Sequence, residues 1–133
     1  MNPVTAPFGF LRVAAACPPV SVADPARNAE HVLRFVEDAR KQGVQVLVFP
    51  ELGLTGYTCG DLFFSLTTLI GGAEQALARI LAATANNAMI VAVGLPACHE
   101  GRLFNVAAVI QKGRILGVVP KTYLPGYKEY YEE

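Results

Sequence analysis

Two short apolar runs, separated by one amphipathic stretch, constrain the fold of this chain more than any other feature. Residues 10–17 and 44–49 are each too short for a helix, are followed directly by proline, and predict buried strands. Between them, Asp24 followed by Pro25 is a typical helix start, apolar residues recur at helical spacing, and Gly43 is a typical helix end. A strand, helix, strand unit of this kind favours a parallel pair of strands.

The rest of the chain adds a second long helix and three more strands to this prediction. Residues 62–69 are apolar without a clear period and suggest a short helix beside a pocket. A longer amphipathic helix is expected to begin after Gly71 and Gly72 and to end around residues 86–87. A two-residue hairpin turn is predicted at residues 112–113. The predicted strands are residues 89–94, 103–111 and 114–120. The fold class is therefore α/β, a mixed sheet covered by helices.

Composition and charge argue against several classes of protein and of binding partner. The 133 residues suffice for one domain or part of one, and the 53% hydrophobic content argues against disorder. Eleven basic residues balance eleven acidic ones, which leaves no basic field for nucleic acid or an anionic membrane. No apolar run approaches the roughly twenty residues that cross a bilayer, and residues 1–9 lack the basic region of a signal peptide. Three cysteines without a CxxC pair predict a reduced, cytoplasmic protein.

Two segments carry more polar and aromatic residues than packing requires. In residues 49–57, Glu51 directly follows a predicted strand, where partial desolvation would suit a carboxylate to general-base work. The same carboxylate could instead cap a backbone amide or pair with an arginine at the sheet edge. In residues 120–132, Lys121 also follows a strand end, ahead of several tyrosines. A lysine in that position more often reaches into solvent than takes part in catalysis.

Together the two segments resemble sequence motifs of the nitrilase (carbon–nitrogen hydrolase) superfamily. Residues 49–57 with Asp61 are similar to its block F-P-E-L-x-L-[ST]-G-Y followed by an acidic residue. Residues 121–132 are similar to K-x-Y-L-P-x-Y-x-E-[FY]-Y-E, a block more particular to the amino-terminal glutaminase domain of glutamine-dependent NAD synthetases. The resemblance extends from about Phe10 to the last residue.

Members of that family hydrolyse amides with a Glu, a Lys and a Cys, and the resemblance implies roles for several residues. Glu51 would take the proton of the thiol, and Lys121 would stabilise the oxyanion that forms when the thiolate attacks a carbonyl. Tyr57 and Tyr127 would line the pocket for glutamine, and Glu129 would orient the lysine or the base. The side chains of Glu51 and Lys121 should then converge in one cleft, within reach of a hydrogen bond or one bridging water.

The resemblance also implies the fold, the domain organisation and the partners. Residues 1–133 would form the amino-terminal part of a single glutaminase domain, the first half of an α-β-β-α four-layer sandwich. The ammonia-dependent synthetase domain, which uses ATP and magnesium, would lie outside this segment. No glycine-rich phosphate loop is present, and no cofactor is expected within the segment. The expected partners are glutamine, the synthetase domain of the same protein and further copies of the chain in a homo-oligomer.

The family's nucleophilic cysteine belongs to a third motif, beyond the lysine block, that these 133 residues do not include. Cys17, at the end of an apolar run, is expected to be a small core residue. Cys59 lies outside any nucleophile motif. Cys98 and His99 resemble a nucleophile beside its base, yet adjacent residues in a turn point in different directions. His31 is expected on the surface, and two isolated histidines predict no metal site.

The sequence thus predicts a segment of a glutaminase that supplies ammonia for NAD synthesis, and a 133-residue chain that is inactive on its own. Two alternatives stay open. The chain could belong to a stand-alone carbon–nitrogen hydrolase that acts on another amide or on a nitrile, although the aromatic block after Lys121 argues against this. It could also be a non-catalytic fragment that only folds and associates.

Overall fold

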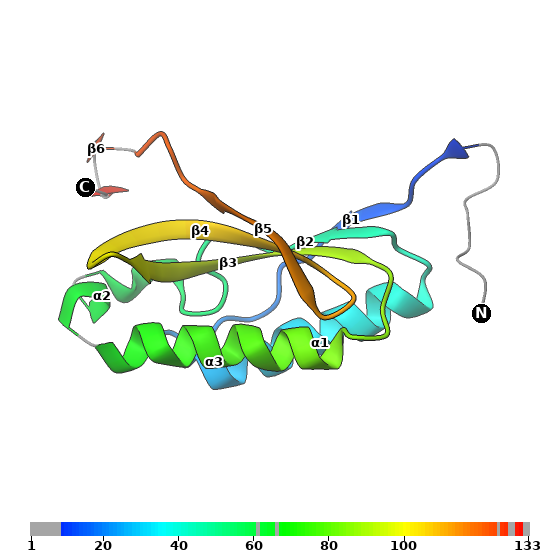
Figure 1. Cartoon of the computed structure of the whole chain (residues 1–133), viewed down its shortest axis with the longest axis horizontal. Coiled ribbons are helices and arrows are strands. Elements are labelled where there is room, and N and C mark those ends of the chain that lie inside the picture. The colour runs from blue at the N-terminus through cyan, green and yellow to red at the C-terminus, as the bar shows by residue number, and fades with distance from the viewer. Residues whose placement is uncertain (1–8, 61, 66, 125, 128–129, 132–133) are drawn as a thin grey trace.

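The computed structural model describes residues 9–60, 62–65, 67–124, 126–127 and 130–131 (Figure 1). A five-stranded sheet has the strand order β1-β2-β3-β4-β5, and a separate two-stranded sheet pairs β6 with β7. The strands are β1 (Val13–Ala15), β2 (Val46–Val48), β3 (Ile90–His99), β4 (Arg102–Gln111), β5 (Arg114–Pro120), β6 (Gly126–Tyr127) and β7 (Tyr130–Tyr131). The helices are α1 (Pro25–Lys41), α2 (Leu62–Ser65), α3 (Thr67–Ala83) and a 3-10 helix at Tyr57–Cys59.

The five-stranded sheet is mixed, as the sequence predicts. β1 pairs with β2, and β2 with β3, in parallel, whereas β3 pairs with β4, and β4 with β5, in antiparallel fashion. Helices α1 and α3 lie together on one face of the sheet (Figure 1). Side chains from these helices and from the sheet face beneath them form one hydrophobic core. The predicted α/β class is confirmed.

Helix α1 lies close to its predicted position, for local reasons. The side-chain Oδ1 of Asp24 accepts a hydrogen bond from the backbone N–H of Arg27 at 3.1 Å, and Pro25 occupies the first turn. Basic residues occupy the last turn, where they interact favourably with the carbonyl groups of the helix end. Gly43 then takes a φ of 70°, a conformation that side chains disfavour, and the chain turns toward β2.

The predicted start of the second long helix is wrong. Helix α3 begins at Thr67, so Gly71 and Gly72 lie inside it rather than ahead of it. Gly72 faces Pro25 of α1, and a Cβ placed there would come within 3.4 Å of the proline ring. Gly72 therefore allows α1 and α3 to pack closely, and it does not mark the start of the helix. Within the described part of the chain, none of the helices is long and apolar enough to cross a membrane.

The predicted end of the third strand is also wrong. β3 extends to His99 rather than stopping at residue 94, and it includes Pro96. The pairing of β3 with β2 ends at Ala92, so β4 is the only neighbour of β3 at Pro96 among the described strands. A proline can occupy such a position because its missing N–H faces no partner strand.

The predicted burial of the first strand is wrong as well. β1 is three residues long, and Phe10, Leu11 and Val13 are 72%, 67% and 65% exposed. Cys17, expected to be a core residue, is exposed. Alternate residues of each strand point away from the helices. We call this side of the sheet the open face, and it includes the exposed Val13 and Val48.

A β-bulge sets the register of β5 against β4. Ile110 pairs with Ile115, but the preceding residue, Val109, pairs with Gly117. Leu116 is therefore an extra residue on β5 without an opposite partner in the ladder. Beyond the bulge the pairing is regular to the end of the strand.

Candidate active site

The ends of neighbouring strands bring polar side chains together on the open face. β5 runs in the same direction as β2 and β3, because two antiparallel pairings separate it from β3. Glu51 follows β2 and Lys121 follows β5, so both lie at the same edge of the sheet. The backbone N–H of Lys121 donates to the carbonyl oxygen of Asn105, near the start of β4, at 2.8 Å. The ladder thereby places Lys121 beside Asn105, and the side chain of Lys121 reaches Glu51, which is 70 positions away in sequence.

The side chains of Glu51 and Lys121 form a direct ion pair. The Nζ of Lys121 donates to the Oε1 of Glu51 at 2.6 Å. The side chain of Lys121 is 27% exposed and that of Glu51 is 43% exposed, so the pair is partly shielded but accessible. The predicted convergence of these two side chains is confirmed. The lysine does not simply extend into solvent, and the partner of Glu51 is a lysine rather than an arginine.

Asn105 is a third member of this group, and sequence reasoning missed it. Its Nδ2 donates to the same oxygen of Glu51, Oε1, at 2.6 Å. The signal was available, because Asn105 is a polar residue inside the apolar run of residues 103–110. Its neighbours Val106, Ala108 and Ile110 point to the core, and Asn105 belongs to the opposite, open face.

The loop that carries Glu51 is pressed against β3 at Gly94. The backbone N–H of Leu54 donates to the carbonyl oxygen of Gly94 at 3.1 Å. A Cβ at Gly94 would lie 2.6 Å from both the nitrogen of Leu52 and the carbonyl oxygen of Pro50. Such distances are far inside van der Waals contact, so only glycine permits this approach of the loop.

The far end of the same loop is held by a buried asparagine. Asn28 of α1 is 1% exposed, and its Nδ2 donates to the carbonyl oxygens of Ser21 at 2.8 Å and Leu54 at 3.1 Å. Its Oδ1 accepts from the backbone N–H of Ser21 at 2.8 Å. The N–H of Ala23 also donates to the carbonyl oxygen of Thr55 at 2.8 Å. These bonds tie the loop to the start of α1 and limit the positions that Glu51 can adopt.

The ion pair lies in the wall of a concavity of about 370 Å³ on the open face. Among the described residues, the polar side chains that line it are Glu51, Asn105 and Lys121, and the other lining residues are apolar, glycine or proline. A mostly apolar hollow with a few convergent polar groups is typical of a site for a small molecule. A carboxylate and an ammonium in contact can exchange a proton with a bound molecule and stabilise negative charge that forms on it.

The other predicted site residues are not all placed in this concavity. Tyr57 begins the 3-10 helix, is partly buried and is not among the described residues that line the hollow. The backbone of Tyr127 lies in β6, but its side chain is outside the described part of the structure. Glu129 also lies outside the described residues.

The three cysteines differ in their surroundings, and none lines the concavity. Cys59 is buried, and its thiol donates to the carbonyl oxygen of Thr55 at 3.1 Å. Burial raises the pKa of the Cys59 thiol, with a smaller opposing effect from a backbone hydrogen bond at Ala23, so the neutral thiol is favoured. Cys98 is exposed in β3, where Cys98 and His99 point to opposite faces of the sheet.

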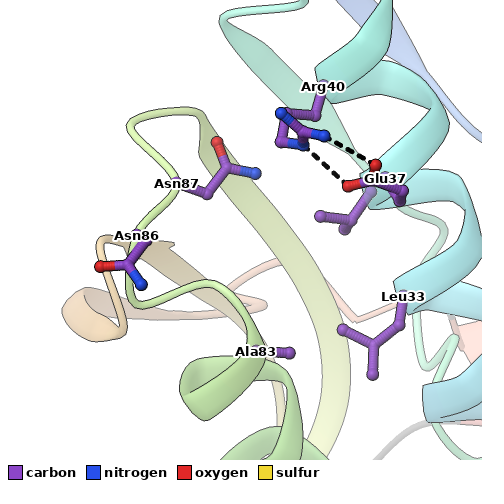
Figure 2. A pocket seen from close by; sticks show the side chains of 7 residues that line it. Leu33, Glu37, Arg40, Ala83, Asn86 and Asn87 are labelled. Atoms are coloured by element: carbon purple, nitrogen blue, oxygen red, sulfur yellow. Dashed lines mark hydrogen bonds and ion pairs between the residues drawn. The ribbon is translucent and has the colours of Figure 1, made fainter. Parts of the chain in front are cut away.

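A second concavity of similar volume, about 370 Å³, lies between α1 and the end of α3 (Figure 2). Its charged residues are Glu37 and Arg40, which bind each other through two hydrogen bonds of 2.7 Å. The hydrogen bonds from Arg40 lower the pKa of Glu37. Asn86 and Asn87 also line this hollow, and Asn87 lies across it from the pair (Figure 2). Both charged groups of this hollow lie on one helix, at positions i and i+3, and about half of each side chain is exposed. Glu51 and Lys121 instead converge from separate strand ends, and the side chain of Lys121 is only 27% exposed, so the first concavity is the more suitable reaction site.

Within the described ranges, no group of three or more His, Cys, Asp and Glu side chains is arranged to hold a metal ion. His31, expected on the surface, is partly buried, and its Nδ1 lies 2.6 Å from the carbonyl oxygen of Pro19. His99 is exposed near the β3–β4 turn and lies 4.0 Å from the carboxylate of Glu100.

Residues 12–133 match the carbon-nitrogen hydrolase family. The chain belongs to the carbon–nitrogen hydrolase family. Among curated members, the glutamine-dependent NAD(+) synthetase of Mycobacterium tuberculosis is 41% identical over 124 residues, which cover 93% of this chain and 18% of that protein. The protein of that name from Aquifex aeolicus is 36% identical over 112 residues, or 84% of this chain and 19% of its own length. The chain thus spans about a fifth of the length of these relatives.

Solved structures agree with this family assignment. A glutamine-dependent NAD(+) synthetase from Cytophaga hutchinsonii superposes with a TM-score of 0.84 at 27% identity, over 91% of this chain and 20% of that one. An amidase of the nitrilase superfamily from Nesterenkonia superposes with a TM-score of 0.76 at 21% identity, over 88% of this chain and 45% of that one. The amidase shares the fold, and the mixed sheet with its helices is therefore a carbon–nitrogen hydrolase arrangement.

Proposed function

We propose that this segment is part of a glutaminase domain that releases ammonia from glutamine, and that a longer glutamine-dependent NAD synthetase uses this ammonia. The observation that carries the proposal is the Glu51–Lys121 ion pair at 2.6 Å, in a chain that is 41% identical to the M. tuberculosis synthetase over 124 residues. The concavity beside the pair is of a size that suits a small amide.

In the proposed reaction, Glu51 accepts the proton of a cysteine thiol supplied from outside these residues. The thiolate then attacks the side-chain carbonyl carbon of glutamine, and the carbonyl oxygen takes up the negative charge. Lys121 stabilises that oxygen through its ammonium group. The carbon–nitrogen bond breaks as Glu51 returns its proton to the leaving nitrogen, which departs as ammonia. Water hydrolyses the remaining thioester and restores the free thiol, with Glu51 again acting as the base.

The proposal includes a setting and partners for the domain. The partner domain is the synthetase part of the same protein, which would bind ATP and magnesium, while residues 1–133 themselves need no cofactor. Several copies of the protein associate as a homo-oligomer in the cytoplasm. Tyr57, Tyr127 and Glu129 contribute to the glutamine pocket. Tyr57 does not line the concavity in this structure, so this role requires its side chain to lie closer to Glu51 and Lys121 when glutamine binds.

The proposed function predicts the fate of one nitrogen atom. Glutamine labelled with ¹⁵N in its amide group should transfer the label to NAD when it is supplied to the full-length protein with deamido-NAD, ATP and magnesium. The measurement is the mass of the NAD product. Label that appears only as free ammonia, with no NAD formed, would favour the stand-alone hydrolase. No release of label in any form would contradict a glutaminase role.

The 133-residue chain alone should release no ammonia from glutamine, because none of its cysteines lines the concavity. Cys59 is the nearest of the three in sequence to Glu51, but it is buried and its raised pKa favours the unreactive thiol. The measurement is ammonia release by the purified chain, with Cys59→Ala as the comparison. Release by the original chain that disappears in Cys59→Ala would show that this cysteine does act as a nucleophile.

A further inference from the structure

We propose that Asn105 is a positioning residue that fixes the Glu51 carboxylate for proton transfer. This inference rests on the proposed function, in which Glu51 is the base. The Nδ2 of Asn105 and the Nζ of Lys121 both donate to Oε1 of Glu51, each at 2.6 Å. Among the described residues, no donor is bonded to the other carboxylate oxygen, Oε2. Two donors on one oxygen fix the rotation of the carboxyl group and direct Oε2 toward the incoming proton.

The position of Asn105 is itself fixed by the sheet. It lies in β4, opposite Pro96 of β3, so its backbone belongs to a continuous antiparallel ladder. Its carbonyl oxygen accepts the backbone N–H of Lys121 at 2.8 Å. One residue therefore holds the carboxylate through its side chain and the main chain of the lysine through its backbone. A side chain in the interior of a strand, such as Asn105, is held more rigidly than one on a loop, such as Glu51.

The proposed reaction gives a reason for a second, neutral donor. While the thiolate attacks, Lys121 must donate to the developing oxyanion, and its hold on Glu51 weakens. The amide of Asn105 has no such task and keeps the carboxylate in place throughout the step. Because the amide carries no charge, it also leaves the charge balance between base and lysine unaltered.

The test is the kinetics of Asn105→Leu and Asn105→Asp in the full-length protein, with glutamine and with ammonia as nitrogen sources. Asn105→Leu removes the donor, and we expect kcat with glutamine to fall about 10- to 100-fold, while KM for glutamine changes little. Synthesis from ammonia should be unchanged. Lys121, the charged group that faces Glu51 among the described residues, is retained in both variants.

Asn105→Asp keeps the shape of the side chain but replaces the donating amide with a second carboxylate against Glu51, so kcat with glutamine should fall at least as far as in Asn105→Leu. Gln111→Leu is the matched control, because Gln111 is another amide of β4 whose Nε2 donates to the carbonyl oxygen of Ala88 at 2.7 Å, far from the site. It should leave kcat unchanged with either nitrogen source.

A wild-type kcat in Asn105→Leu would overturn the inference, and so would an equal fall in Gln111→Leu. If the wild-type protein itself makes no NAD from glutamine, the proposed function fails first, which distinguishes the two outcomes.

Discussion

Replacing Glu51 with glutamine should abolish NAD synthesis from glutamine and leave synthesis from free ammonia intact. The amide is isosteric with the carboxylate, and its oxygen can still accept hydrogen bonds from Lys121 and Asn105. The fold of the loop should therefore persist. The amide cannot accept the thiol proton, however, and removal of a general base lowers the rate by about 100- to 10,000-fold. The measurement is NAD formation with each nitrogen source in parallel.

Glu74→Gln is a suitable control for the charge that this substitution removes. Glu74 is an exposed carboxylate on α3, on the side of the sheet away from the site. Its replacement should affect neither nitrogen source. An equal loss of both activities in Glu51→Gln would contradict the separation of the glutaminase site from the synthetase reaction.

Gly94→Ala should displace the loop that carries Glu51 and destabilise the domain. The new methyl group would lie 2.6 Å from two backbone atoms, the nitrogen of Leu52 and the carbonyl oxygen of Pro50. Backbone atoms cannot rotate aside as a flexible side chain can, so the loop must shift. Overpacking of this kind costs about 1 to 3 kcal/mol, and a displaced base lowers the rate with glutamine. We expect a lower melting temperature together with a lower glutamine-dependent rate.

Gly117→Ala provides the matched control on another strand of the same sheet. A Cβ at Gly117 would meet no heavy atom within 4 Å, and the residue has no positive φ. Its substitution should change the free energy of unfolding by about 0.5 kcal/mol or less. If Gly94→Ala matched Gly117→Ala in both stability and rate, the loop would not depend on this close approach.

The convergence of Glu51 and Lys121 could be predicted because each lies just beyond the end of a strand, Lys121 directly after β5 and Glu51 three residues after β2. Carboxyl ends of strands that run in one direction meet at one edge, so adjacency in sequence to a strand end carries information about position in space. The resemblance to family motifs then supplied the pairing. Asn105 could not be predicted in this way, because it lies inside a strand and belongs to neither motif. Its partner, Glu51, is moreover placed by the loop after β2. A polar residue at an open-face position of an apolar strand was the available signal.

The errors in the prediction have a common physical cause. An apolar run predicts a strand but not how many neighbours cover it, so the exposure of Val13 and Cys17 could not be read from residues 10–17 alone. Likewise, a proline interrupts a strand only where its nitrogen, which carries no hydrogen, faces a partner strand. Whether this is so at Pro96 depends on where the pairing with β2 ends. Both outcomes are set by packing between elements, which a local pattern does not contain.

The β-bulge at Leu116 has a consequence for changes in chain length. Between the bulge and the site, the side chains of residues 117–121 alternate between the two faces of the sheet, and an inserted or deleted residue there would turn the ammonium of Lys121 toward the helices. Deletion of Leu116 would instead restore a regular ladder and leave Lys121 beside Asn105. Natural variation in the length of β5 should therefore collect at Leu116 and in the hairpin turn before it, and should be absent from residues 117–121.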